Sequence, residues 1–345
     1  MSARRLQPLR LLASVFCGAL SSLAFSATSH ADAPGPTDYS SRITRIELTE
    51  GASLPDGVDI SVQGHDAFLS VRVSAGTTVD IMGYEGEPYL RIGADCLVVE
   101  NQRSMSTWYN RERFGSDVDR GLVNHESPPD WKQVGSNCAV AWHDHRLHYM
   151  SPSAPVNAEP GDVLVIDSIP LTISGIEVEV HVESVLVKRP SRATPIATAA
   201  ITAVVAGMLL WLRLTWLTTI VASFIALALG GAQYLWSAAE TGPQLTLIAI
   251  PLLALVAAGR AFLARHAPPL VTTVGAQLLC GVLLAVWVWQ RAGVMAAALL
   301  PTSIPYFVDR AGTAVIGTVA VVSSSHAAAV LWRLASTSPT RPTQA

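Results

Sequence analysis

The fold is decided by residues 176–212, which read IEVEVHVESVLVKRPSRATPIATAAITAVVAGMLLWL. In residues 176–183 apolar residues alternate with acids and one histidine, which is the two-residue period of a strand with one buried face. After the basic junction at 188–192, residues 193–212 are almost wholly apolar and long enough for a helix that crosses a membrane. The sequence therefore predicts a polar domain that ends at residue 190 and a membrane region that begins at residue 193.

Upstream of this boundary the chain carries shorter strand-like runs with glycines and prolines between them. Many short strands of this kind favour a β-sandwich, so residues 42–190 are predicted to form an all-β, immunoglobulin-like sandwich domain after a flexible leader at 32–41. Residues 101–137 show no period and are predicted to form a long loop. The runs lie at residues 43–49, 58–62, 69–73, 78–82, 89–92, 97–99, 139–145 and 163–166.

Downstream of the boundary the pattern predicts an all-α transmembrane bundle of about five helices within residues 193–334. The stretch 292–308 contains Pro301 and Pro305. It is interpreted as interfacial or re-entrant, and a six-span arrangement that crosses there is the alternative. The five predicted spans are residues 193–212, 215–236, 244–264, 268–290 and 312–334, followed by a cytoplasmic tail at 335–345.

Residues 1–31 are typical of a secretory signal peptide. Arginines are followed by an apolar run at 11–25 and by Ser29-His30-Ala31, a small-x-small cleavage site. The alternative is an uncleaved anchor helix. Cleavage places the β-domain outside the cell, so the chain is predicted to be a multi-pass protein of a bacterial cell membrane with an extracytoplasmic N-terminal domain. Most span-flanking arginines then lie inside, as the positive-inside bias requires, namely Arg213, Arg260, Arg265, Arg333 and Arg341; the basic residues of 188–192, Arg291 and Arg310 do not.

The composition narrows the classes of function. Only 14% of the residues are charged, against roughly 25% in an average soluble domain, and the net charge is −3. A nucleic-acid partner is therefore not expected, whereas the lipid bilayer and another envelope protein are. The chain has no Gly-x-Ser-x-Gly elbow, His-Glu-x-x-His helix or phosphate loop, so it is predicted not to be an enzyme.

Cys96 and Cys138 are the two cysteines of the predicted exported domain. Cysteines in an oxidising compartment usually pair, so a disulfide bond is predicted between them. A pair of thiolate metal ligands is the alternative. Cys280 lies in an apolar span and is interpreted as a small packing residue.

The densest chemistry lies in Trp142-His143-Asp144-His145-Arg146-Leu147-His148-Tyr149-Met150. In an extended segment His143 and His145 project from one face and make a two-nitrogen clamp, which His148 or Met150 completes if the chain turns after Arg146. Imidazole with thioether suits copper. Binding should weaken as the pH falls through the histidine pKa, about 6.5. The alternative is a purely structural hydrogen-bonded network in which Asp144 pairs with an arginine.

Two polar residues stand out in the predicted spans. His326 follows three serines, and Gln277 lies within the fourth span. Ionisable groups at that depth are functional candidates, but histidine can be neutral, and serines also allow close helix packing. Packing is the preferred interpretation, and a transporter subunit that uses both residues is a third functional hypothesis.

Three blocks together carry a resemblance. They are GYEGEPYLR at 83–91, YNRERFG at 109–115 and WHDHRLH at 142–148. In combination they resemble a group of actinobacterial envelope proteins with a signal peptide, an exported β-domain and a C-terminal multispan region. The resemblance implies architecture and location but no chemistry. It places small or polar residues at 96 and 138, and the paired departure to cysteine favours the disulfide.

The leading hypothesis from the sequence is a membrane-anchored extracytoplasmic protein that binds or senses a metal ion, copper, through His143, His145, His148 and Met150. The alternative is a non-enzymatic structural or interaction protein of the bacterial cell envelope. In that case the loop at 101–137 and the acidic face of 176–183 would contact a partner.

Overall fold

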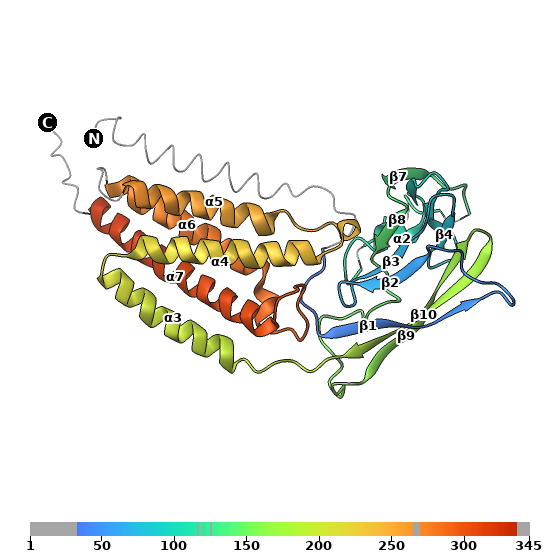
Figure 1. Cartoon of the computed structure of the whole chain (residues 1–345), viewed down its shortest axis with the longest axis horizontal. Coiled ribbons are helices and arrows are strands. Elements are labelled where there is room, and N and C mark those ends of the chain that lie inside the picture. Colours follow the sequence, from blue (N-terminus) through green and yellow to red (C-terminus); the bar gives the residue numbers. More distant parts are fainter. Residues whose placement is uncertain (1–32, 116, 120, 125, 265–269, 337–345) are drawn as a thin grey trace.

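The computed structural model describes residues 33–336 with the exception of residues 116, 120, 125 and 265–269. A β-domain and a helical region follow one another along the long axis of the molecule (Figure 1). The predicted signal peptide at 1–31 and most of the predicted tail at 335–345 lie outside the described residues.

The β-domain contains two antiparallel sheets that share one hydrophobic core. The larger sheet has the strand order β1-β10-β9-β4-β5-β6-β7, and the smaller has the order β2-β3-β8. The prediction of an all-β domain is thus confirmed, whereas an immunoglobulin-like strand order is not. The strands are β1 (Tyr39–Leu48), β2 (Asp59–Gln63), β3 (Phe68–Arg72), β4 (Val79–Met82), β5 (Pro88–Ile92), β6 (Val98–Asn101), β7 (Trp131–Gly135), β8 (Ala139–Trp142), β9 (Val163–Ile173) and β10 (Ile176–Leu186).

The alternating run that decides the fold forms β10. Val178, Val180 and Val182 point into the core, as the two-residue period predicts. Its partner β9 extends seven residues beyond the predicted run at 163–166, past Pro170. Proline cannot donate to a ladder, and Pro170 lies just outside the stretch of β9 that pairs with β4, so its missing N–H is tolerated.

Two predicted irregular segments contain regular structure. β1 begins at Tyr39, inside the range predicted as leader, and Thr37 already forms an antiparallel bridge with Leu299. The predicted loop at 101–137 contains the short helix α2 (Met105–Tyr109) as well as β7. The elements α2 and β7 have five residues each, too few to produce a recognisable period.

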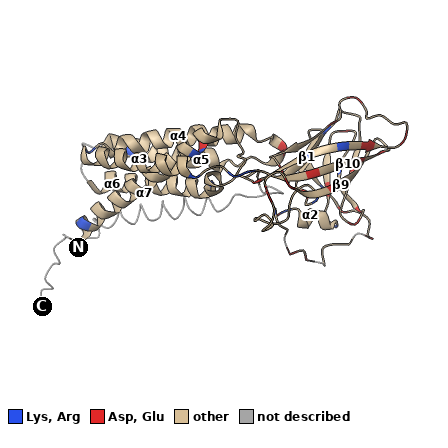
Figure 2. Cartoon of the chain, turned by 90° about the horizontal axis from the view of Figure 1, so that it is seen from below, with Lys and Arg blue, Asp and Glu red and all other residues tan. Residues whose placement is uncertain are grey.

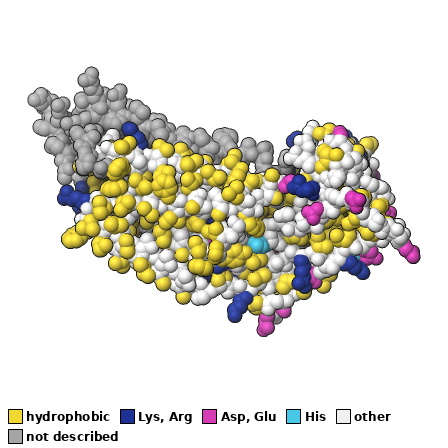
Figure 3. Space-filling view, in the orientation of Figure 1, with side chains coloured by type: hydrophobic (Ala, Val, Ile, Leu, Met, Phe, Trp, Pro, Cys, Tyr) yellow, Lys and Arg dark blue, Asp and Glu magenta, His cyan; other side chains and the backbone are white. Residues whose placement is uncertain are grey.

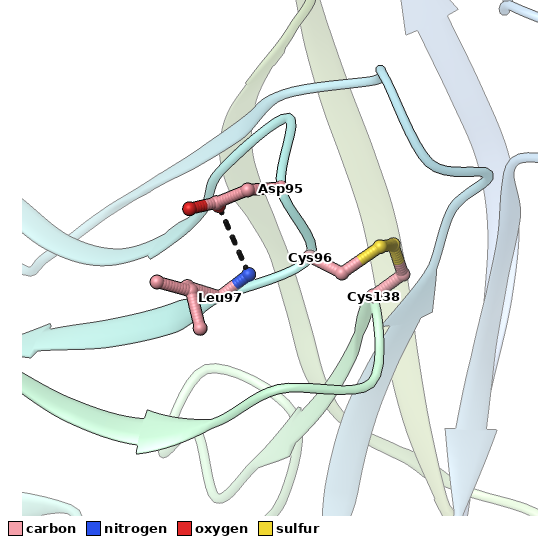
Figure 4. The surroundings of a disulfide bond; sticks show 4 residues. All are labelled: Asp95, Cys96, Leu97 and Cys138. Carbon is pink, nitrogen blue, oxygen red and sulfur yellow. Dashed lines mark hydrogen bonds between the residues drawn. A yellow bond between two sulfur atoms is a disulfide. The ribbon is translucent and has the colours of Figure 1, made fainter.

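Cys96 and Cys138 form the predicted disulfide bond (Figure 4). Cys96 lies in the turn between β5 and β6, where Asp95 accepts a hydrogen bond from the Leu97 amide at 3.1 Å. Cys138 directly precedes β8. The bond therefore joins a turn of the larger sheet to the strand of the smaller sheet that leads into the histidine run.

The helical region contains, among the described residues, five helices long and apolar enough to cross a membrane. Hydrophobic side chains cover much of its surface in Figure 3. In Figure 2 the charged residues lie on the β-domain, at the opposite end and at a few positions along the helices. The stretch 292–308 forms the short 3-10 helix η4 (Ala292–Met295), a loop and the first turn of α7, so it is not a sixth crossing helix. The five are α3 (Ala193–Trp211), α4 (Thr215–Trp236), α5 (Thr246–Leu263), α6 (Leu270–Gln290) and α7 (Tyr306–Ser336).

The β-domain rests on the connections α4–α5 and α6–α7. His65 Nε2 lies 3.0 Å from the Leu300 carbonyl oxygen, and its ring contacts Trp236 with 5.1 Å between centroids. Arg72 forms an ion pair at 2.6 Å with Glu240 of the 3-10 helix η2 (Ala239–Thr241). Because five helices run to and fro along the bundle, the C-terminal end of α7 lies at the end of the bundle away from the β-domain (Figure 1).

Two of the arginines that the positive-inside bias does not explain, Arg291 and Arg310, are buried in the protein, whereas Arg189 and Arg192 are exposed. Arg291 is buried and donates to both carboxylate oxygens of the buried Asp309, at 2.9 and 2.8 Å. Arg310 donates to backbone carbonyls of the α6–α7 connection, including that of Ala297 at 2.6 Å. These two charges are compensated inside the structure and need not report on the side of the membrane.

Candidate metal centre

The histidine run begins where β8 ends. His143 follows Trp142, the last residue of the strand, and the chain then turns, with the Leu147 amide donating to the Asp144 carbonyl oxygen at 3.0 Å. The predicted strand at 139–145 is thus too long. His143 and His145 converge because of this turn and not because they alternate along a strand.

Asp144 holds the turn in place. Its buried carboxylate accepts hydrogen bonds from the Trp142 indole at 3.0 Å and from the Arg146 side chain at 2.9 and 2.8 Å. Burial by itself would raise the pKa of Asp144, but the hydrogen bonds and charge of Arg146 outweigh it and hold that pKa below its usual range. The structural network considered from the sequence therefore exists, and it positions the histidines on either side of Asp144.

His143, His145 and His148 form a triad of buried imidazoles. One ring nitrogen from each lies within 4.8 Å of the others. The Nε2 atoms of His143 and His148 are 2.8 Å apart, and the rings of His143 and His145 meet edge to face with centroids at 5.1 Å. The turn after His145 thus brings the third histidine to the first two, as the sequence allowed.

Each imidazole is anchored through one nitrogen to a backbone carbonyl. His143 Nδ1 lies 2.7 Å from the Ala67 oxygen, His148 Nδ1 lies 3.0 Å from the Tyr149 oxygen, and His145 Nε2 lies 3.0 Å from the Glu112 oxygen. A carbonyl only accepts, so these contacts form when the three nitrogens carry hydrogens. In that tautomer the other nitrogen of each neutral ring has the lone pair that a metal ion needs.

The other nitrogens of the rings differ in their surroundings. Among the described residues, His145 Nδ1 is buried without a hydrogen-bond partner. His143 Nε2 lies 2.8 Å from His148 Nε2 and 3.3 Å from the Arg113 carbonyl oxygen, so a hydrogen on either Nε2 atom would be shared between the two rings. Metal-binding histidines are commonly anchored to a carbonyl in this way through the nitrogen that does not bind the ion.

The surroundings keep the triad neutral. Burial lowers the pKa of His143 to about 4 and the pKa of His148 to about 3, and it also lowers the pKa of His145. The nearby charge of Arg113 contributes in the same direction to all three shifts. The lone pairs are therefore available at neutral pH, and competition from protons starts below the value of about 6.5 used in the sequence analysis.

The predicted loop at 101–137 closes the site. It supplies the Glu112 and Arg113 carbonyl oxygens, and Tyr109 and Phe114 place their rings against His145 and His148. Asp66 fixes this segment through a buried ion pair with Arg113. Sequence reasoning missed these backbone partners, because any residue carries a carbonyl and no residue type marks its position.

The remaining predicted site residues lie apart from the triad or stay untested. Met150 is half-buried two residues beyond His148, and its role as a ligand stays a prediction. Gln277 is buried in α6 with its Nε2 unpartnered, whereas His326 is half-buried in α7. Both belong to the helical region, and the triad belongs to the β-domain.

A second grouping of metal-ligand types among the described residues is Glu47, Glu179 and His181 on β1 and β10. It is largely exposed, and Arg45 pairs with Glu47 at 2.7 Å and lies 3.1 Å from His181 Nε2. A cation there would compete with a guanidinium already in place. The triad is therefore the stronger candidate.

Comparison of the chain with models of known protein families, with curated proteins and with solved structures finds no match. The function is therefore argued from the geometry of the triad alone.

Proposed function

We propose that the protein is a membrane-anchored metal-binding or metal-sensing protein whose β-domain holds one metal ion through His143, His145 and His148. The observation that carries the proposal is the convergence of three buried imidazoles, with one nitrogen of each ring within 4.8 Å of the others and each ring anchored to a backbone carbonyl. Neutral imidazoles gathered in this way can bind a cation together.

We infer copper as the metal, as the sequence suggests. The three ligands are neutral imidazoles, and no thiolate competes, because Cys96 and Cys138 are joined to each other. Imidazole suits both copper and zinc, and a thioether from Met150 would shift the preference to copper. Ligands about 2.0–2.1 Å from an ion lie more than 3 Å apart in a tetrahedral site, so binding should separate His143 and His148 slightly.

The proposed location is the outer face of a bacterial cell membrane. It rests on the predicted signal peptide and on the positions of Arg213 and Arg333 at the end of the helical region that lies away from the β-domain. The triad would then face the space from which an envelope protein meets metal ions.

Metal analysis of the purified full-length protein in detergent tests the proposal. After loading with Cu²⁺ and removal of excess metal, one ion per chain is expected. The double variant His143→Ala, His145→Ala should lose it, while His181→Ala, which removes a half-buried imidazole of the same domain outside the triad, should keep it. Equal loss in the control, or no binding by the parent under Cu²⁺ or Zn²⁺, contradicts the proposal.

A purely structural network is the competing function, and the Asp144–Arg146–Trp142 hydrogen bonds favour it as an account of the turn. Those bonds do not reach the lone-pair nitrogens of the triad. If the double variant fails to fold and the parent binds no metal, the network account of an envelope interaction protein replaces the metal account.

A further inference from the structure

The triad offers a metal ion three neutral ligands. Among the described residues, no carboxylate oxygen or thiolate belongs to the group of converging ligand atoms, which consists of ring nitrogens alone. Glu112 contributes its backbone oxygen, 3.0 Å from His145 Nε2, and the residue itself is exposed. An ion bound by the triad would therefore keep its full positive charge.

The two buried carboxylates that flank the triad along the chain are each paired with an arginine. Asp144, between His143 and His145, accepts from Arg146 at 2.9 and 2.8 Å. Asp66, next to the residue that anchors His143, forms an ion pair with Arg113. Neither carboxylate could turn to an ion on the triad without leaving a guanidinium without its partner.

The triad is also surrounded by aromatic rings. Phe68, Tyr109 and Phe114 each place a ring beside one of the imidazoles, with centroids 6.2, 4.5 and 6.4 Å from it. None of the three histidines is more than 8% exposed. The cost of moving an ion from water into such surroundings grows with the square of its charge. A divalent ion therefore loses far more hydration than a univalent ion, and it gains no anionic ligand in return.

We propose that the triad binds univalent copper, Cu⁺, in preference to divalent ions. This inference rests on the proposed function, since it assigns the charge of the ion that the same three histidines hold. Univalent copper is stable with fewer ligands than Zn²⁺, which takes four, so three imidazoles suffice for it. A thioether from Met150 would act in the same direction, because soft ligands select Cu⁺.

The test compares Cu⁺ with Zn²⁺, because both have filled d shells and differ chiefly in charge. A comparison of Cu²⁺ with Zn²⁺ would instead report the general order of divalent affinities. The full-length protein in detergent is titrated at pH 7 against a competing chelator of known affinity for each ion. Cu⁺ is kept reduced by ascorbate in the absence of air, and only binding that His143→Ala, His145→Ala loses is counted.

Cu⁺ should bind about a hundredfold tighter than Zn²⁺, since the penalty for an uncompensated buried charge exceeds two factors of ten. Zn²⁺ that binds as tightly as Cu⁺, or more tightly, overturns this inference and leaves the metal site standing. A parent that binds neither ion overturns the proposed function and the inference with it.

A second comparison changes the charge beside the triad. Phe114 is 42% exposed, so Phe114→Glu and Phe114→Gln place polar side chains of nearly equal shape next to His148. Relative to the glutamine variant, the glutamate variant should tighten Cu⁺ binding about tenfold and Zn²⁺ binding about a hundredfold, because the attraction is proportional to the charge of the ion. Gln133→Glu, which adds the same charge at an exposed position of β7, should change neither affinity. Equal gains for both ions in Phe114→Glu would overturn the argument from charge.

Discussion

The triad and the cluster around Arg291 are both buried groups of polar side chains, and they differ in how their hydrogen bonds are satisfied. Arg291 donates to Asp309, to Gln233 Oε1 at 2.9 Å and to Thr313 Oγ1 at 3.3 Å, so its donors meet acceptors. In the triad His143 Nε2 and His148 Nε2 lie 2.8 Å apart, and His145 Nδ1 has no hydrogen-bond partner among the described residues.

The difference separates structure from function. In the Arg291 cluster donors and acceptors satisfy one another, so the cluster stabilises the packing of α4 and α7 against the end of α6. A cluster whose polar atoms are incompletely satisfied, such as the triad, can still bind a ligand. Variants of the two clusters should therefore behave oppositely. Variants of the Arg291 cluster should lower stability without changing the metal content, and variants of the triad should lower the metal content before they lower stability.

The largest expected effect is on the Arg291 cluster. Asp309→Leu leaves a buried guanidinium without its partner and should cost about 3–5 kcal/mol, seen as loss of monodisperse protein after detergent extraction. The double variant Arg291→Met, Asp309→Leu removes both charges and should recover most of the folded protein with unchanged metal content. A double variant as unstable as the single one, or one without metal, would show that the two clusters are not independent.

The disulfide comes next. Its 42-residue separation predicts a loss of about 2–4 kcal/mol in the free energy of unfolding for Cys96→Ser with Cys138→Ser. Denaturant titration with and without reductant measures it. Reductant should destabilise the parent and leave the variant unchanged, and a parent insensitive to reductant would argue against a structural bond.

Acidification tests the neutrality of the metal-free triad. Its folded pKa values, about 4 for His143 and about 3 for His148, lie below the unfolded value, so the unfolded chain binds more protons as the pH falls. The stabilisation is complete above about pH 6.5 and declines from there toward these folded values, by about 1.4 kcal/mol per pH unit for each histidine. Denaturation midpoints at pH 7, 6 and 5 measure the slope.

The control for this slope is His143→Asn with His148→Asn, which should flatten it, whereas His181→Ala should not. An identical slope in all three proteins would show that other groups dominate the acid response. Copper release should follow the same lowered range, below the value expected from an isolated histidine.

The smallest effect is expected at His326. It is half-buried in α7 and neither the triad nor the Arg291 cluster includes it, so His326→Asn should change stability by less than about 0.5 kcal/mol. Thermal midpoint and membrane abundance check this. A selective growth phenotype at normal abundance would instead favour a transporter role that includes Gln277.

The sequence predicts the fold well where a pattern extends over many residues. The valines of β10 follow the two-residue period, and the bounds of α4 agree with the apolar stretch at 215–236. β7 and the second half of β9 were missed, since the first is short and the second contains Pro170. The antiparallel bridge between Thr37 and Leu299 depends on packing between segments far apart in the sequence, which no local pattern encodes.

The site is predictable in its residue types and not in its geometry. Three histidines within six residues indicate the chemistry, but their convergence depends on a turn that the Asp144 carboxylate holds. The anchoring carbonyls of Ala67 and Glu112 come from remote segments. These anchors orient the rings, and the convergence of the rings carries the proposal.

X-ray absorption at the copper edge of the loaded full-length protein tests the central claim most directly. The account predicts three imidazole nitrogens about 2.0–2.1 Å from the ion. An additional sulfur would establish Met150 as a fourth ligand. A shell with fewer than two imidazoles, or one unchanged in His143→Ala, His145→Ala, would contradict the account.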